Sequence, residues 1–182
     1  MNNLMKKIFV VALGMTLFFS ARLTCAGDDA HVHPTGLQYL NEPAPEFFVV
    51  DRNGEKTSIK DFKGRAVLLH FWATWCAPCK DEFPAFEKLY QEFGRKGLTI
   101  LAVSIDSVAG LDEVTKRAVS YGGTFPVYVA RQGSVTNKYW TWGVPVTYFI
   151  NKKGLIAARG IGQQDWAGEG IKRFVKELIE EK

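Results

Sequence analysis

A buried strand leads directly into an amphipathic helix near the middle of this chain. Residues 65–72, RAVLLHFW, form a near-continuous apolar run, which is typical of a strand buried on both faces of a sheet. From Phe83 to Phe93 apolar residues recur every three or four positions, which predicts one face of a helix. Cys76 and Cys79 lie between the two patterns, so this C-x-x-C motif is expected where the strand ends and the helix begins.

Strand and helix patterns alternate along the rest of the chain. Alternation of this kind requires crossover connections and therefore parallel strand pairs, whereas the short turn before the last strand predicts an antiparallel pair. The predicted elements are a β-hairpin around Asn53-Gly54, strands at 65–72, 98–106, 125–130, 146–151 and 155–161, and helices after Cys76, at 110–121, up to Trp142 and at 165–181, the last with Asp165 as its N-cap. We therefore expect an α/β fold with a single mixed sheet covered by helices on both faces.

The N-terminal residues have the pattern of a secretory signal peptide. Lys6 and Lys7 precede a short apolar stretch, and the small residues at 24–26 offer a cleavage site. The apolar stretch is shorter than the roughly 20 residues that cross a bilayer, so an uncleaved membrane anchor is the weaker alternative, as is a lipid-modified Cys25. The expected organisation is a signal peptide at 1–26, a polar tail or linker at 27–41 and one domain at 42–182, in the periplasm or another extracytoplasmic space.

Charge and cysteine content narrow the function classes. The formal net charge is +4, but the predicted signal peptide carries Lys6, Lys7 and Arg22 and no acid, which leaves +1 on the exported part. This charge gives no support to a nucleic-acid-binding surface, and we expect no nucleic-acid partner. With Cys25 removed, only the two cysteines of the C-x-x-C motif remain, so there is no wider disulfide framework.

The position of the two cysteines predicts different roles for them. Cys76 at a helix N-terminus lies near unpaired N–H groups and the positive end of the helix dipole, which favours thiolate and makes this cysteine the nucleophile. Cys79 lies one turn deeper on the same side of the helix, where it can attack a mixed disulfide formed by Cys76. Pro78 fits the first helical turn, which needs no N–H at that position.

Other roles for the cysteines have less support. A structural zinc site needs four ligands, and no second C-x-x-C or C-x-x-H completes one, so we expect no metal site. A permanent structural disulfide is disfavoured because so small a loop removes little chain entropy. The P-x-x-x-T-x-x-C element of peroxidases is absent, because Leu69 and Ala73 occupy its Pro and Thr places. A Cu(I) site with two thiolates and His70 stays open, because soft ligands suit that ion.

The motif FWATWCAPCKDEFP, together with the distant pair Val144-Pro145, resembles the thioredoxin superfamily and specifically its exported TlpA/ResA/DsbE branch. The similarity runs from about Pro43 to Trp166 and so covers nearly the whole expected domain. It implies a thioredoxin-like fold with an added N-terminal β-hairpin and a central βα insertion. It also implies a cis peptide bond at Pro145, which would present backbone to an incoming substrate chain beside the disulfide.

The resemblance further implies an enzyme, a thiol:disulfide oxidoreductase that needs no cofactor besides its own Cys76-Cys79 disulfide. Members of this branch mostly reduce protein disulfides, often in apocytochrome c, with electrons from a membrane thiol transporter of the CcdA or DsbD kind. Ala77-Pro78 between the cysteines, in contrast to the Pro-His pair of oxidising relatives, favours the reducing direction. Ala77 also replaces the acidic residue of some members, which weakens the assignment of apocytochrome c. An oxidising disulfide donor and a copper-binding thiol protein or metallochaperone stay as alternatives.

The remaining site candidates are a substrate surface and two proton carriers. The substrate surface comprises Trp75, Ala77, Pro78, Val144 and Pro145, whereas Trp72 is expected in the core. Glu82 is either a buried carboxyl that relays the proton of Cys79 or a solvated helix glutamate. His70, six residues before Cys76, is either a proton acceptor beneath the motif or a neutral, hydrogen-bonded core histidine. We expect the protein to act as a monomer.

Overall fold

The computed structural model describes residues 36–51, 55–130, 135, 138–139 and 143–181. Eight strands form one mixed sheet in the order β1-β8-β7-β4-β5-β6-β2-β3. The strands are β1 (Gln38–Pro43), β2 (Phe48–Val50), β3 (Lys56–Ser58), β4 (Ala66–Trp72), β5 (Leu98–Ser104), β6 (Val127–Val129), β7 (Val146–Ile150) and β8 (Leu155–Ile161). The helices are α2 (Ala77–Phe93), α3 (Leu111–Ser120) and α4 (Glu169–Glu180), with 3-10 turns η1 (Ile59–Phe62) and η2 (Gly94–Lys96).

Strand β4 is the centre of the sheet. It pairs in parallel with β5 and antiparallel with β7, and all seven of its residues are buried. Successive side chains point to opposite faces, so Leu68 and Trp72 join one hydrophobic cluster while Val67 and Phe71 join the other. The prediction of a central strand buried on both faces is confirmed.

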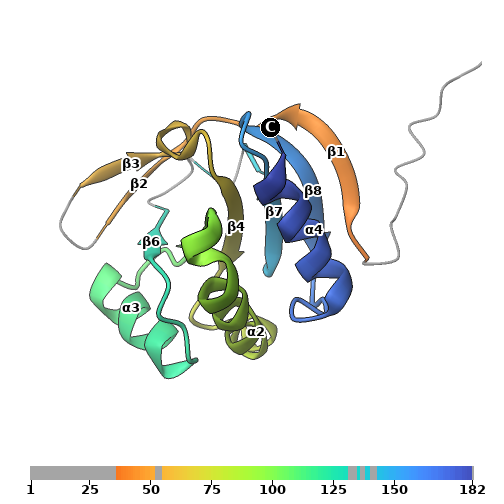
Figure 1. The fold of residues 1–182 in the computed structure, drawn as a ribbon. Coiled ribbons are helices and arrows are strands. Elements are labelled where there is room, and N and C mark those ends of the chain that lie inside the picture. Colours follow the sequence, from red (N-terminus) through yellow and green to blue (C-terminus); the bar gives the residue numbers. More distant parts are fainter. Residues whose placement is uncertain (1–35, 52–54, 131–134, 136–137, 140–142, 182) are drawn as a thin grey trace, which may run out of the picture.

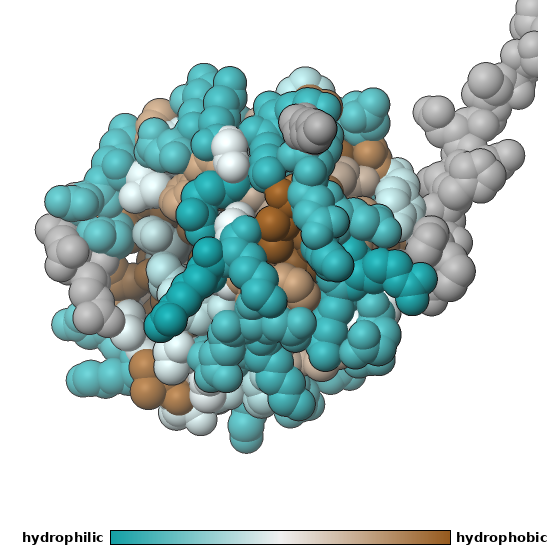
Figure 2. All heavy atoms as spheres, in the orientation of Figure 1, coloured by the Kyte–Doolittle hydropathy of each residue, from teal (hydrophilic) through white to brown (hydrophobic). Residues whose placement is uncertain are grey.

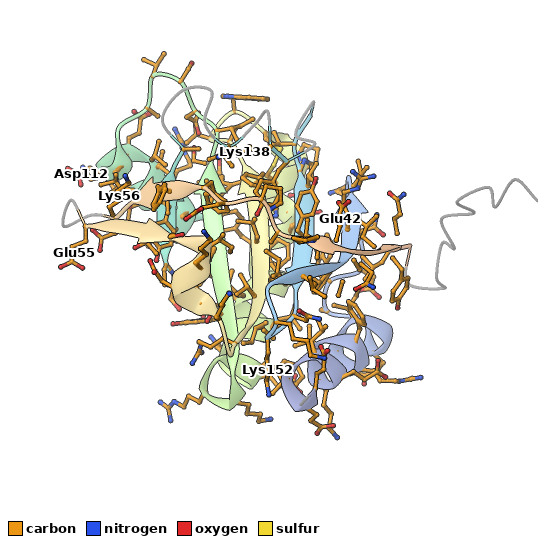
Figure 3. The ribbon with its side chains drawn as sticks, turned by 90° about the horizontal axis from the view of Figure 1, so that it is seen from above. Glu42, Glu55, Lys56, Asp112, Lys138 and Lys152 are labelled. Carbon is orange, nitrogen blue, oxygen red and sulfur yellow. A yellow bond between two sulfur atoms is a disulfide. The ribbon has the colours of Figure 1, made fainter. Side chains whose placement is uncertain are left out.

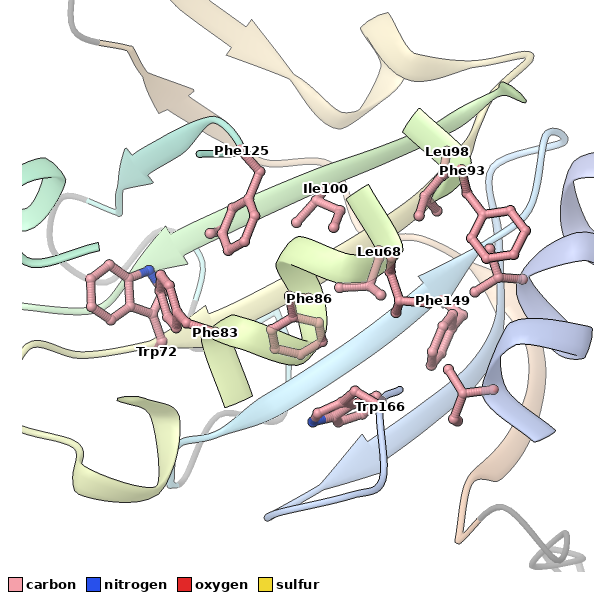
Figure 4. Packing of buried hydrophobic residues seen from close by; sticks show 14 of the residues in the cluster. Leu68, Trp72, Phe83, Phe86, Phe93, Leu98, Ile100, Phe125, Phe149 and Trp166 are labelled. Carbon is pink, nitrogen blue, oxygen red and sulfur yellow. The ribbon is translucent and has the colours of Figure 1, made fainter. Parts of the chain in front are cut away.

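The two faces of the sheet are covered unequally. Residues of α2, α3 and α4 pack in one cluster, which we call the helix-side core (Figure 4). The other cluster is closed by η1, by the hairpin strand β2 and by Val135 and Tyr139. The thioredoxin-like α/β fold with a central mixed sheet is confirmed. The three α-helices of the described residues all contribute to the helix-side core (Figure 1).

The predicted β-hairpin is present at the β6 edge of the sheet. Strands β2 and β3 pair antiparallel, with Phe48 opposite Ser58, and β2 also contacts β6 through Val50 and Val129. The turn at 52–54 lies outside the described residues. Helix α3 and strand β6 follow one another between β5 and β7, as the expected insertion required.

Two predicted boundaries are wrong. The tail predicted at 27–41 overlaps β1, which starts at Gln38 and pairs with β8, and Leu37 before it is fully buried. This edge strand has no clean alternation of apolar and polar residues, because none of its residues is fully buried and its second half is exposed. The last helix begins at Glu169 with Gly168 as its N-cap, so the prediction of Asp165 as the N-cap is wrong. The backbone carbonyl of Asp165 instead accepts a hydrogen bond from the Gly168 N–H in a turn before the helix.

The predicted signal peptide at 1–26 lies outside the described residues, as do most of the predicted tail and of the short helix before Trp142. Among the described residues, no helix is both long and apolar enough to cross a bilayer. Hydrophilic residues predominate on the face that Figure 2 shows, with small hydrophobic areas between them. Charged side chains of both signs, such as Glu42, Glu55 and Lys152, project from separate parts of the molecule (Figure 3).

Candidate active site

The C-x-x-C motif lies at the edge of the sheet where several strands end. Strands β4, β5 and β8 run in the same direction, because β5 is parallel to β4 and β8 is antiparallel to β7, which is antiparallel to β4. Their carboxyl ends therefore meet at one edge, which we call the disulfide edge. Cys76 follows the end of β4 at this edge, and Pro145 immediately precedes β7 at the same edge.

Cys76 and Cys79 form a disulfide at the start of α2, with their Cα atoms 5.3 Å apart. Cys76 is the N-cap of the helix, and its sulfur accepts a hydrogen bond from the Cys79 N–H at 3.2 Å. Cys76 is 5% exposed and Cys79 is 0% exposed, so the first cysteine is the more accessible one. The strand-to-helix junction, the helix N-terminus and the deeper second cysteine are confirmed.

The residues around the cysteines divide into exposed and buried ones as predicted. Trp75 is 70% exposed, and Ala77 and Pro78 are exposed beside it. Trp72 is fully buried and packs edge-to-face on Phe83, with ring centroids 4.8 Å apart. An exposed tryptophan next to the nucleophile offers an apolar contact to a polypeptide, but its role in substrate binding stays a prediction.

The Val144–Pro145 peptide bond is cis, as the resemblance implied. The carbonyl oxygen of Pro145 accepts a hydrogen bond from the Gly162 N–H at 2.9 Å, so this bond is fixed to the end of β8. Its contact with a substrate backbone stays a prediction.

Glu82 is a buried glutamate one turn after Cys79. It is 3% exposed, so the alternative of a solvated helix glutamate is wrong. Its Oε1 accepts a hydrogen bond from the Trp166 indole N–H at 2.8 Å, while Oε2 has no hydrogen-bond partner. Burial raises the pKa of Glu82 to about 7, against the smaller lowering by the hydrogen bonds of the Trp166 indole and the Gln164 backbone. A carboxyl group with this pKa can both release and take up a proton near neutral pH.

His70 faces Glu82 from strand β4. The imidazole is fully buried against Phe86, its Nδ1 lies 3.0 Å from the Thr147 hydroxyl oxygen, and its Nε2 has no hydrogen-bond partner. Burial lowers the pKa of His70 to about 3. The 4.0 Å separation of His70 Nε2 from Glu82 Oε2 is therefore no ion pair at neutral pH, because the imidazole is neutral. The structure shows His70 as a buried, hydrogen-bonded residue, and its role as a proton acceptor stays a prediction.

Three contacts of the site were not anticipated from the sequence. Trp166 and Thr147 provide the hydrogen bonds of Glu82 and His70, and the Asp106 carboxylate binds Thr74 in the loop before Cys76. The only signal for Asp106 in the sequence is its place in the run Ser104-Ile105-Asp106, at the end of an apolar strand. An acid that is buried at such a place needs polar partners.

A comparison with known sequences identifies the family. The family model described as AhpC/TSA family matches residues 40–159. The thiol-disulfide oxidoreductase ResA of Bacillus thuringiensis is 34% identical over 140 residues, which cover 76% of this chain and 78% of the relative. The chain belongs to the AhpC/TSA family. It is a thioredoxin-like thiol-disulfide oxidoreductase that is similar to ResA.

Further relatives of this AhpC/TSA family protein agree with the fold and the chemistry. The thioredoxin-like protein YneN of Bacillus subtilis is 39% identical over 122 residues, 66% of this chain and 71% of the relative. The thioredoxin domain of a thiol-disulfide oxidoreductase from Bacteroides vulgatus has a TM-score of 0.65 at 28% identity and covers 74% of this chain and 96% of that chain. A thiol:disulfide interchange protein from Bacteroides sp. has a TM-score of 0.66 at 27% identity, and the match covers 75% of this chain and 90% of that chain.

A metal-binding role finds no additional ligands in the described part of the chain. No group of three or more His, Cys, Asp and Glu side chains there is arranged to hold a metal ion. His70 Nδ1 is engaged with Thr147, and its Nε2 faces Glu82 across 4.0 Å. A Cu(I) ion at this site would have to rely on the two cysteine sulfurs.

Proposed function

We propose that this oxidoreductase reduces disulfide bonds in other proteins outside the cytoplasm, with Cys76 as the nucleophile and Cys79 as the resolving cysteine. The observation that carries the assignment is the Cys76 sulfur at the N-terminus of α2, where it accepts the Cys79 N–H. A thiolate at this position is stabilised by the helix dipole and by that N–H. Cys79 beneath it is shielded from other disulfides until Cys76 has reacted.

The reaction consists of two exchanges. The Cys76 thiolate attacks one sulfur of the substrate disulfide, a mixed disulfide forms, and the other substrate sulfur leaves as a thiolate. Cys79 then loses its proton and attacks the Cys76 sulfur, so that the second substrate sulfur leaves. The substrate gains two electrons and, after protonation, two protons, and the protein ends with the Cys76-Cys79 disulfide.

Glu82 and His70 are proposed to handle the proton of Cys79. Glu82 lies one turn after Cys79 on α2 and is buried with it. When Glu82 is protonated, its carboxyl group can donate a hydrogen bond to the neutral His70 Nε2 if the 4.0 Å separation shortens slightly. This hydrogen bond would provide a partner for two buried atoms that otherwise have none. Above its pKa of about 7, Glu82 has lost its proton to solvent, and the ionised carboxylate can accept the proton that Cys79 releases.

The direction of electron flow and the partners are part of the proposal. The resemblance to the TlpA/ResA/DsbE branch and the Ala77-Pro78 pair support reduction. The same resemblance suggests haem-attachment cysteines of an apocytochrome c as substrate and a CcdA- or DsbD-type membrane thiol transporter as electron donor. The positively charged and apolar pattern of the N-terminal sequence supports export, and we propose that the exported protein acts as a monomer. An oxidising disulfide donor is the second candidate, because C-x-x-C chemistry runs in either direction.

The reduction potential of the Cys76-Cys79 pair tests the direction. We expect a value near the thioredoxin end of the scale, about −270 mV, after equilibration in defined thiol buffers and alkylation of the free cysteines. A value near about −120 mV would make the protein an oxidant and reverse the proposed electron flow.

The two cysteine variants test the assignment of roles. We expect Cys79→Ser to accumulate mixed disulfides with a reducible protein such as insulin, because the Cys76 thiolate attacks and nothing resolves the product. Cys76→Ser should accumulate almost none, since Cys79 is buried. Mass spectrometry of the non-reduced products measures both. Equal trapping by both variants would contradict the assignment, and binding of Cu(I) without any trapping would favour the copper-handling alternative.

A further inference from the structure

Asp106 is a buried acid just beyond strand β5, and its carboxylate accepts three hydrogen bonds. Oδ2 accepts from the Thr74 N–H at 2.9 Å and from the Ser104 hydroxyl, and Oδ1 accepts from the Thr74 hydroxyl at 2.8 Å. Asp106 is 7% exposed, and within the described residues it forms no ion pair. A buried carboxylate without a cation depends on such donors, and hydrogen bonds to a charged acceptor are the strong ones.

Thr74 is held by three of its polar groups. Its N–H and hydroxyl bind Asp106, and its carbonyl oxygen accepts a hydrogen bond from the Tyr121 hydroxyl at 3.1 Å. Tyr121 ends helix α3, so the loop after β4 is attached both to the end of β5 and to α3. The partners are 32 and 47 residues away in sequence, so only the folded sheet brings them to Thr74.

The attachment of Thr74 fixes the backbone that leads into Cys76. The Cys76 N–H donates to the Ala73 carbonyl at 3.1 Å and closes a tight turn around Thr74 and Trp75. The direction in which Cys76 enters the helix therefore depends on where Thr74 is held. That direction in turn brings the Cys76 sulfur within 3.2 Å of the Cys79 nitrogen.

We propose that Asp106 is a positioning residue for disulfide exchange, which acts through Thr74 to hold the Cys76 sulfur at the N-terminus of α2. This inference rests on the proposed role of Cys76 as the nucleophile. Tyr121 supports the same turn from the side of α3. Trp75, between Thr74 and Cys76, is held outward by the same turn and is 70% exposed.

Thr74→Val tests this role, because it removes the hydroxyl and leaves both the backbone N–H and the charge of Asp106. The measurement is the second-order rate constant for reduction of 5,5′-dithiobis(2-nitrobenzoate) by the reduced protein as a function of pH. We expect the plateau rate constant at high pH to fall about tenfold, which corresponds to about 1.4 kcal/mol of lost transition-state stabilisation. Thr74→Ser keeps the hydroxyl and should retain the wild-type rate.

The chain offers a matched control at Thr124. Its N–H and hydroxyl bind the buried Glu87 at 2.6 and 2.7 Å, the pattern by which Thr74 binds Asp106. Glu87 lies about three turns along α2 from Cys76, and Thr124 leads to no cysteine. Thr124→Val should lower the urea midpoint of unfolding as Thr74→Val does, but leave the exchange rate unchanged.

Several outcomes decide the matter. An unchanged plateau rate in Thr74→Val, or an equal loss of rate in Thr124→Val, would overturn the positioning role.

Asp106→Asn separates the effect of position from the effect of charge. Removal of a negative charge alone would favour the Cys76 thiolate and shift the pH profile of the rate constant to lower pH, whereas lost positioning lowers the plateau rate constant. If Thr74→Val does not fold, Tyr121→Phe replaces it in the experiment. We expect its plateau rate constant to fall about threefold, which corresponds to about 0.65 kcal/mol, and an unchanged rate constant in Tyr121→Phe would overturn the proposal. A wild-type protein that fails to reduce the probe would instead refute the proposed function.

Discussion

At the scale of single residues, Glu82 and His70 put two titratable groups inside the helix-side core within 4.0 Å of each other. Burial acts on them in opposite directions, because it disfavours the charged form of each: the pKa of Glu82 rises to about 7 and that of His70 falls to about 3. Around pH 5 to 6 both are therefore neutral in the folded protein. A pair of this kind stores one exchangeable proton without burying a net charge.

The raised pKa of Glu82 predicts how stability depends on pH. Between the ordinary value of 4.5 and about 7, folded Glu82 keeps a proton that unfolded Glu82 loses, so this group lowers the free energy of unfolding as pH rises through that window. Glu82→Gln lacks the effect. Between pH 4 and pH 8, we expect the wild-type free energy of unfolding to fall by about 3 kcal/mol more than that of Glu82→Gln. Urea denaturation of both proteins across this pH range measures the difference.

Glu42→Gln provides the control for this prediction, because Glu42 is an exposed glutamate of β1 and forms no ion pair among the described residues. Its unfolding free energy should follow the wild-type pH dependence. Parallel curves for Glu82→Gln and wild type would mean that Glu82 is ionised in the folded protein at pH 5, contrary to its burial beside a neutral His70.

The sequence predicted the cysteines and their order, because a local motif at a strand-to-helix junction determines both. It left the state of Glu82 open, since the burial of Glu82 depends on Trp166, which is 84 residues away. The role of Thr74 was missed for the same reason: nothing within one turn of it shows that Asp106 will be its partner. Contacts across strands and loops need the folded sheet.

At the scale of elements, the strands with continuous apolar runs were predictable and the edge strand β1 was not. Strands β4, β5 and β7 are buried along nearly their whole length, and such burial requires apolar residues at successive positions. Only half of β1 is even partly buried, so its sequence resembles a polar linker. The start of α4 was misplaced because Asp165 is a good capping residue that here lies in the preceding turn.

Removal of β1 should destabilise the domain. We expect a chain that begins at Ala44 to lose about 3 kcal/mol of unfolding free energy relative to one that begins at Gly36, because Leu37 leaves a fully buried position and β8 loses its partner strand. Urea denaturation of the two chains measures the difference. Equal midpoints would show that residues 36–43 add no stability, as expected of the polar tail predicted at 27–41.

At the scale of the whole molecule, the disulfide is carried by the rigid centre of the sheet and surrounded by loops from its neighbours. Cys76 follows β4, Asp106 follows β5 and Pro145 precedes β7, so three adjacent strands contribute one site residue each. The helix-side core holds α2 against these strands (Figure 4). Topology rather than local sequence therefore assembles the site, and the resemblance to a known fold is what made the assembly predictable.

The first described residues enter the fold at the disulfide edge. Gln38 at the start of β1 pairs with Arg159, two residues before the end of β8, and Gly36 lies close against the Gln164 side chain beyond that end. If the predicted signal peptide at 1–26 stays in the membrane as an anchor, its connection to the domain enters beside the active site and limits how far the cysteines can move from the lipid surface. Cleavage of the predicted signal peptide would then affect not only where the protein resides but also which electron donors can reach its disulfide.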